Sequence, residues 1–253
     1  MVPKSVVPPS WEVPLQFRER LGERVGRQRA MLADGHLLLV LHRPPKKDET
    51  ERFARLFWRK PDGTWQSSEL GNGPTALTRH LGDFAELIDK FDRQEDQAQS
   101  VADYFGILEG VSPLARTVRN LHAVLQDARE KLPGDRDLIN SRDKAYELER
   151  SAELLVADVR NALDFATAKK SEEQAAASHE MAIASHRLNL LAAFFFPIAT
   201  LSAVFDTSLS HPLEQYVPAP YAFYSVIGLG LFLGVALAGY LAAARTDAQN
   251  GRS

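Results

Sequence analysis

The sequence predicts an α+β protein with a small N-terminal α/β cytosolic domain, a helical hairpin that includes a very long stalk helix, and two C-terminal transmembrane helices. Three observations predict it: a strand-length apolar run between turn residues near the N-terminus, helical periodicity without Pro or Gly from Asp135 to Pro197, and two nearly uncharged apolar runs near the C-terminus. We expect five segments: a Pro-rich and charged leader (1–30), the α/β domain (31–111), the helical stalk (112–187), the transmembrane domain (188–245) and a tail (246–253).

Composition excludes several function classes. The chain carries 30 Lys plus Arg and 33 Asp plus Glu, a formal charge of -3, and almost all of these residues precede Leu188. Because glutamates alternate with the N-terminal arginines, we expect a solvated surface there and no nucleic-acid partner. The absence of Cys excludes disulfides and thiolate zinc sites and suits a cytosolic compartment. No catalytic motif or phosphate loop occurs, so we expect neither an enzyme nor a cofactor.

Turn residues delimit the elements of the α/β domain. Residues 36–42 (HLLLVLH) form an apolar run between Asp34-Gly35 and Pro44-Pro45, which predicts a strand. Residues 52–59 and 64–68 flank Lys60-Pro61-Asp62-Gly63, which predicts a hairpin because Pro fixes one φ and Gly supplies a positive φ. We expect a sheet of about three strands, covered by a helix over 75–91 whose apolar residues recur at helical spacing.

The stalk is predicted from helix start and stop signals. Ser112 is the expected N-cap of a helix with Pro113 at its first position, and its apolar stripe ends near Lys131. Pro133-Gly134 then breaks the chain, and Asp135 caps the next helix. If that helix is continuous to Phe205, it is roughly 105 Å long, given a rise of about 1.5 Å per residue.

Seven-residue repeats run along this helix. An apolar row from Leu148 to Leu190 forms a seam, but Lys169, Glu173 and Glu180 interrupt it, which favours a wide homo-oligomer around water over a two-stranded zipper. A second row, Glu172, His179 and His186, predicts rings that attract or sense cations in a cytosolic vestibule, and the alternative is an ordinary solvated face. A third row contains Asn189, Phe196 and Ala203, which face one way as a mixed polar and apolar lining that suits a gate and also a permanent seal.

The two apolar runs, 188–205 and 221–241, are each long enough to cross a bilayer. Arg187 precedes the first run and Arg245 follows the second, whereas the segment between the runs has no Lys or Arg. The positive-inside rule therefore predicts a multi-pass protein of the cell (inner) membrane with both termini cytoplasmic. A buried helical hairpin in a soluble domain is the alternative. Gly230 and Gly234 match the small-xxx-small pattern of close helix contact.

The order of these segments resembles the CorA family of divalent-cation transporters. The likeness extends over residues 112–241 in architecture and is sharpest over 196–205 (FPIATLSAVF), which is similar to the apolar run with an early Pro before that family's Gly-Met-Asn signature. The resemblance implies a homopentamer whose first span lines a central pore, with a divalent cation such as magnesium as the transported ion. Asp206, Thr207 and Ser208 occupy the signature positions here.

The altered signature defines the predicted metal site. Asp206 and Ser208 are expected to meet the cation at the pore mouth, and the alternative is that Asp206 only ends the span and holds the following segment in water. The predicted function is a divalent-cation channel or transporter of magnesium type with an altered selectivity site. A non-conducting membrane scaffold or regulatory protein that keeps the architecture is the alternative.

Overall fold

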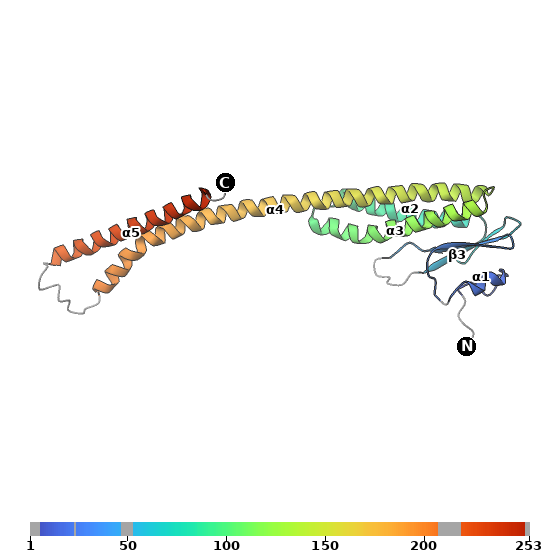
Figure 1. Cartoon of the computed structure of the whole chain (residues 1–253), viewed down its shortest axis with the longest axis horizontal. Coiled ribbons are helices and arrows are strands. Elements are labelled where there is room, and N and C mark those ends of the chain that lie inside the picture. The colour runs from blue at the N-terminus through green and yellow to red at the C-terminus, as the bar shows by residue number, and fades with distance from the viewer. Residues whose placement is uncertain (1–5, 23, 47–52, 207–218, 251–253) are drawn as a thin grey trace, which may run out of the picture. The chain divides into compact units, whose positions relative to one another are not determined.

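The computed structural model describes residues 6–22, 24–46, 53–206 and 219–250, with the backbone alone at 202, 204–206, 219, 220, 222, 223, 226 and 241–250. Two compact units divide the chain, Met1–Lys169 and Lys170–Ser253 (Figure 1). The elements in chain order are α1 (Leu15–Glu19), β1 (Arg29–Ala33), β2 (His36–His42), β3 (Ala54–Arg59), β4 (Trp65–Ser67), α2 (Thr75–Gln97), α3 (Val101–Lys131), α4 (Arg136–Asp206) and α5 (Ala219–Asn250).

The sheet is an antiparallel meander in the order β1-β2-β3-β4. The predicted strand β2 and the hairpin of β3 and β4 are confirmed; in the turn between them Lys60 N donates to Thr64 O at 2.9 Å. Strand β1 is an addition to the roughly three strands expected, and it crosses the predicted boundary at residue 30 between the leader and the α/β domain. Asp34 and Gly35 connect β1 to β2 with φ of 51° and 75°, the two positive values that a type I′ hairpin turn requires.

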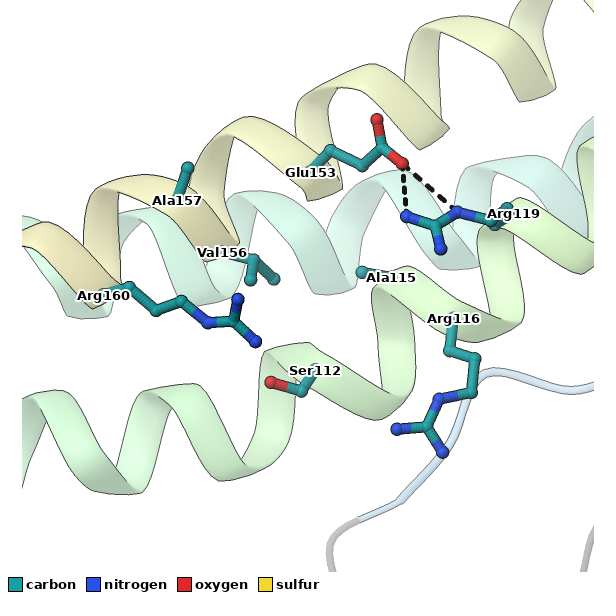
Figure 2. Close-up of a pocket in the computed structure, with 8 residues that line it drawn as sticks. All are labelled: Ser112, Ala115, Arg116, Arg119, Glu153, Val156, Ala157 and Arg160. Carbon is teal, nitrogen blue, oxygen red and sulfur yellow. Dashed lines mark hydrogen bonds and ion pairs between the residues drawn. The ribbon is translucent and has the colours of Figure 1, made fainter.

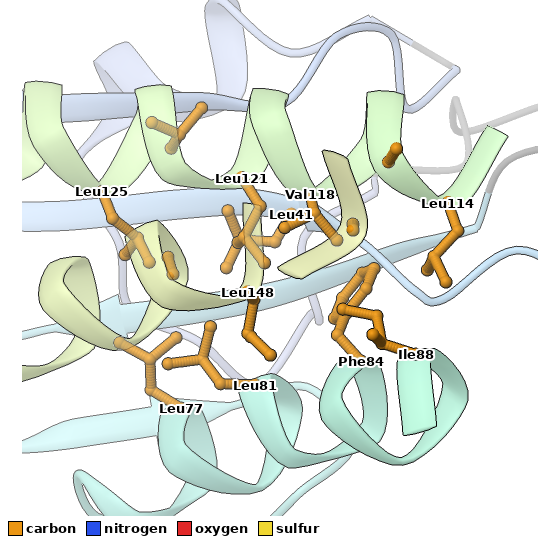
Figure 3. Packing of buried hydrophobic residues seen from close by; sticks show 14 of the residues in the cluster. Leu41, Leu77, Leu81, Phe84, Ile88, Leu114, Val118, Leu121, Leu125 and Leu148 are labelled. Carbon is orange, nitrogen blue, oxygen red and sulfur yellow. The ribbon is translucent and has the colours of Figure 1, made fainter. Parts of the chain in front are cut away.

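Strand β2 is the centre of the first unit because both of its faces are buried. Leu37, Leu39 and Leu41 point into a core that contains α2, α3 and the beginning of α4 (Figure 3). Leu38 and Val40 point to the other face, where the N-terminal segment packs through Val7, Trp11 and Phe17. Each buried leucine contributes about 1.5–3 kcal/mol to the stability of the fold relative to an exposed one. Burial of side chains on both faces therefore stabilises β2 strongly.

A polar network connects β3 to α2. Arg55 Nε donates to Glu69 Oε2 at 3.1 Å, and its Nη1 donates to Asp83 Oδ2 at 2.6 Å and to His80 Nδ1 at 3.0 Å. The His80 ring has no solvent exposure and lies between Phe57 and Phe84. Burial, assisted by the Arg55 charge, lowers the pKa of His80 from 6.5 to about 3, so the ring is neutral and carries its proton on Nε2.

Helix α3 begins twelve residues earlier than the sequence predicted, at Val101 and not at Pro113. Ser100 is its N-cap in a capping box, in which Ser100 Oγ accepts from Asp103 N and Asp103 Oδ2 accepts from Ser100 N. Pro113 lies inside the helix. The prediction of an N-terminus at Ser112 was wrong, because the cap at Ser100 and the burial of Ile107 and Val111 hold the preceding turns in the helix.

Helix α4 begins as predicted after the Pro133-Gly134 break, and Asp135 Oδ1 accepts from Leu138 N at 3.0 Å. Asp135 also accepts from Arg59 Nε at 2.5 Å, which ties the turn to the end of β3. Along the first unit the expected seam of α4 is buried, at Leu148, Ala152, Leu155 and Val159. The helix then continues without a break to Asp206, through Pro197.

In the second unit, α5 lies alongside the later part of α4 (Figure 1). A Cβ added to Gly234 would be 2.7 Å from the carbonyl O of Phe194, and one added to Gly230 would be 3.1 Å from Ile198 Cγ1. The glycines therefore allow the two helices to approach closely, in agreement with the small-xxx-small pattern.

Candidate functional site

Apolar surface distinguishes the second unit. Among the described residues, one helix, α4, contains an 18-residue stretch apolar enough to cross a membrane. The described part of α5 contributes a shorter apolar segment, Ile227–Tyr240. Many large apolar side chains of both helices are exposed. Phe196, Phe232 and Tyr240, for example, have exposed fractions of 71%, 69% and 72%. So large an exposed apolar surface is typical of contact with lipid or with another chain.

The packing of α5 divides α4 into a covered face and a free face. Residues of α4 that are buried or half-buried recur at helical spacing in this region and include Leu190, Ala193, Phe194, Pro197, Ile198 and Leu201. The predicted pore-lining row, Asn189, Phe196 and Ala203, is exposed. These three positions are therefore available to line a channel or to contact a neighbouring copy.

The predicted vestibule row also lies on α4 within the second unit. Glu172 and His179 are exposed, whereas His186 is half-buried. A straight helix rotates a seven-residue row by about 20° per repeat, so the three side chains lie along one gently turning face. The structure thus keeps Glu172 and His179 in solvent and leaves His186 less accessible than the other two.

The predicted metal ligands stay untested. Asp206 is the last residue of α4, and its side chain lies outside the described part. Thr207 and Ser208 lie outside the described residues altogether. Within the described ranges no group of three or more His, Asp or Glu side chains is arranged to hold a metal ion.

A basic hollow between α3 and α4 in the first unit is a feature that sequence reasoning missed. Its volume is about 440 Å³, and it is lined by Ser112, Ala115, Arg116, Arg119, Glu153, Val156, Ala157 and Arg160 (Figure 2). Arg119 Nη2 donates to Glu153 Oε1 at 2.5 Å at one end. In the sequence, the lining residues of each helix recur at positions i, i+3, i+4 and i+7. Only the alignment of α3 against α4 in the helical hairpin brings the two sets of residues together.

Comparisons with known proteins identify the fold. No family model and no curated protein matches the sequence. The structure is similar to the ZntB cytoplasmic domain from Vibrio parahaemolyticus, with a TM-score of 0.52 and 12% identity over 64% of this chain and 80% of that one. It is also similar to the full-length CmaX protein, with a TM-score of 0.50 and 13% identity over 90% of this chain and 83% of that one.

A third structure, the CorA magnesium transporter from Methanocaldococcus jannaschii, aligns with a TM-score of 0.41 and 11% identity over 84% of this chain and 80% of that one. At these identities the comparisons concern architecture and not individual site residues. The chain therefore has the fold of the ZntB cytoplasmic domain and of CmaX.

Proposed function

We propose that this chain is a homo-oligomeric membrane protein that conducts divalent cations of the magnesium type through a pore lined by α4. The observation that carries the proposal is the free face of α4. The later part of α4 is apolar, and Asn189, Phe196 and Ala203 lie exposed on the face that α5 does not cover. The likeness to the ZntB cytoplasmic domain and to CmaX supports the same conclusion at the level of the fold.

Symmetry turns single exposed residues into rings. In a closed cyclic assembly, most simply a pentamer as in the CorA family, each residue of the free face is repeated around the axis. Rings of Glu172 and His179 give the aqueous vestibule an acidic and imidazole lining that concentrates cations ahead of the pore. The ring of Phe196 is an apolar constriction, which suits a gate.

Asp206 and Ser208 are proposed to form the outer mouth in place of the Gly-Met-Asn signature. A carboxylate at the end of a span meets interfacial water and avoids most of the roughly 2.5–3.5 kcal/mol that a charge costs at the bilayer centre. In this arrangement α5 is the second span, and both termini are cytoplasmic in the inner membrane. A periplasmic position of a reporter fused to the C-terminus would contradict this topology.

Cation flux into liposomes tests the function. The purified chain should carry Mg²⁺, Co²⁺ or Zn²⁺ above the level of empty liposomes, and Asp206→Asn should lower that flux several-fold without changing oligomer size. Asp164→Asn is the matched control, because Asp164 is an exposed aspartate of α4 in the first unit. If the wild type carries none of the ions, or is a monodisperse monomer by native mass measurement, conduction is refuted and the membrane-scaffold alternative replaces it.

A further inference from the structure

The hollow between α3 and α4 has a small apolar floor and a charged rim. Ala115 on α3 and Ala157 on α4 are short side chains that line the hollow together with Val156 (Figure 2). Arg160 extends from α4 toward Ser112 of α3, whereas Arg116 leaves α3 one turn further along and points away from Arg160 in the structure. A volume of about 440 Å³ is large enough for a small organic molecule.

The charges of the rim are unequally paired. Arg119 is held by Glu153 through contacts of 2.5 and 3.2 Å, with Glu149 at 3.5 Å, and these carboxylates raise the pKa of Arg119. Arg116 and Arg160 have no hydrogen bond or ion pair to a carboxylate among the residues that the structure describes. Three arginines and one glutamate line the hollow, so the lining has an excess of two positive charges.

We propose that this hollow binds a small phosphorylated anion. Guanidinium groups present planar pairs of N–H donors that match phosphate oxygens, and the Ser112 hydroxyl adds a donor from the facing helix. The floor of Ala115, Val156 and Ala157 accommodates the organic part of such a molecule. A bound phosphate would bridge Arg160 on α4 to Ser112 on α3 and would join the two helices of the hairpin. The exposed Arg116 would reach the same phosphate after a change of its side-chain rotamer.

Binding of inorganic pyrophosphate to the full chain in detergent, measured by isothermal titration calorimetry at low salt and without divalent cations, tests the proposal. The wild type should bind, and Arg116→Gln and Arg160→Gln should each weaken binding by about tenfold or more, because each removes a charge-assisted contact. The matched control is Arg93→Gln, which removes an exposed arginine of α2 that does not line the hollow, and it should bind as the wild type does.

Glu153→Gln provides a test in the opposite direction. Removing the Glu153 carboxylate releases Arg119 from its closest partner and raises the excess charge of the lining, so pyrophosphate affinity should increase several-fold. The proposal is overturned if the wild type does not bind pyrophosphate, or if the Arg116, Arg160 and Arg93 variants all bind it equally. Because the measurement contains no transported cation, its result is independent of whether the chain conducts.

Discussion

Acidification should destabilise the first unit through His80. The folded state holds this ring neutral with a pKa of about 3, whereas the unfolded chain takes up a proton below the ordinary value of 6.5. The stabilisation of the folded state that the neutral His80 ring contributes is therefore fully present above pH 6.5, and it is lost progressively as the pH falls toward 3. Between pH 7.5 and pH 5 the linkage relation gives a loss of about 2 kcal/mol in the free energy of unfolding.

Urea unfolding of the full chain in detergent at the two pH values measures this loss. The three tryptophans, Trp11, Trp58 and Trp65, are all buried in the first unit, so their fluorescence follows the unfolding of that unit without labels. A loss of about 2 kcal/mol lowers the urea midpoint by roughly 1 M, given an m-value of about 2 kcal/mol/M.

His80→Gln separates the histidine from the other titrating groups. Gln cannot take up the proton but keeps an oxygen that accepts from Arg55. The variant should be less stable than the wild type at pH 7.5. On acidification to pH 5, its free energy of unfolding should fall by about 2 kcal/mol less than that of the wild type. His179→Gln is the control, because His179 is exposed in the other unit. Equal losses in the wild type and in His80→Gln would refute the assignment of the pH dependence to His80.

Two further substitutions test packing and capping. Gly234→Ala places a Cβ 2.7 Å from the carbonyl O of Phe194, and we expect an overpacking cost of about 1–3 kcal/mol, seen as a lower melting temperature in detergent. Gly239→Ala, where an added Cβ meets nothing within 4 Å, should not show it. Ser100→Ala removes the N-cap of α3 and should cost about 1 kcal/mol in urea unfolding, whereas the exposed Ser151→Ala should change stability little.

Local patterns were sufficient for most elements of the fold. The apolar run of β2, the Pro-Asp-Gly turn after β3 and the break at Pro133-Gly134 each act within a few residues, and each appears in the structure where it was predicted. Strand β1 was missed because its five residues follow a charged segment and have only two buried positions, Met31 and Ala33. The Asp34-Gly35 turn was the available signal.

The start of α3 shows where local signals conflict. Ser112-Pro113 has the composition of a helix N-terminus, and Gly106 and Gly110 weaken the helical pattern before it. Gly110 is nevertheless required by packing, because a Cβ at this position would lie 2.5 Å from Phe91 Cζ on α2. Tertiary contact thus overrides intrinsic propensity here. The Ser100-x-x-Asp103 pattern was the signal that identified the true start.

The candidate sites depend on contacts that periodicity cannot supply. Seven-residue spacing places Asn189, Phe196 and Ala203 on one face of α4, but the position of α5 decides whether that face is free. Similarly, the basic hollow requires Arg160 of α4 to lie opposite Ser112 of α3. The alignment of α4 against α3 is determined by the length of the turn at 132–135 and by the burial of the seam residues of α4. The spacing of the lining residues within one helix does not show either of these.

The exposed middle of α4 constrains the proposed assembly. Residues 167–182 are all exposed, although they contain the seam positions Lys169 and Ala176. This stretch is rich in Ala, Glu, Lys and Gln, which are strong helix formers, so intrinsic propensity supports the helix where the chain does not cover it. A dry interface there would have to bury Lys169, Glu173 and Glu180, at a large desolvation cost. An assembly of this chain should therefore enclose water around this stretch, the same stretch in which Glu172 and His179 lie.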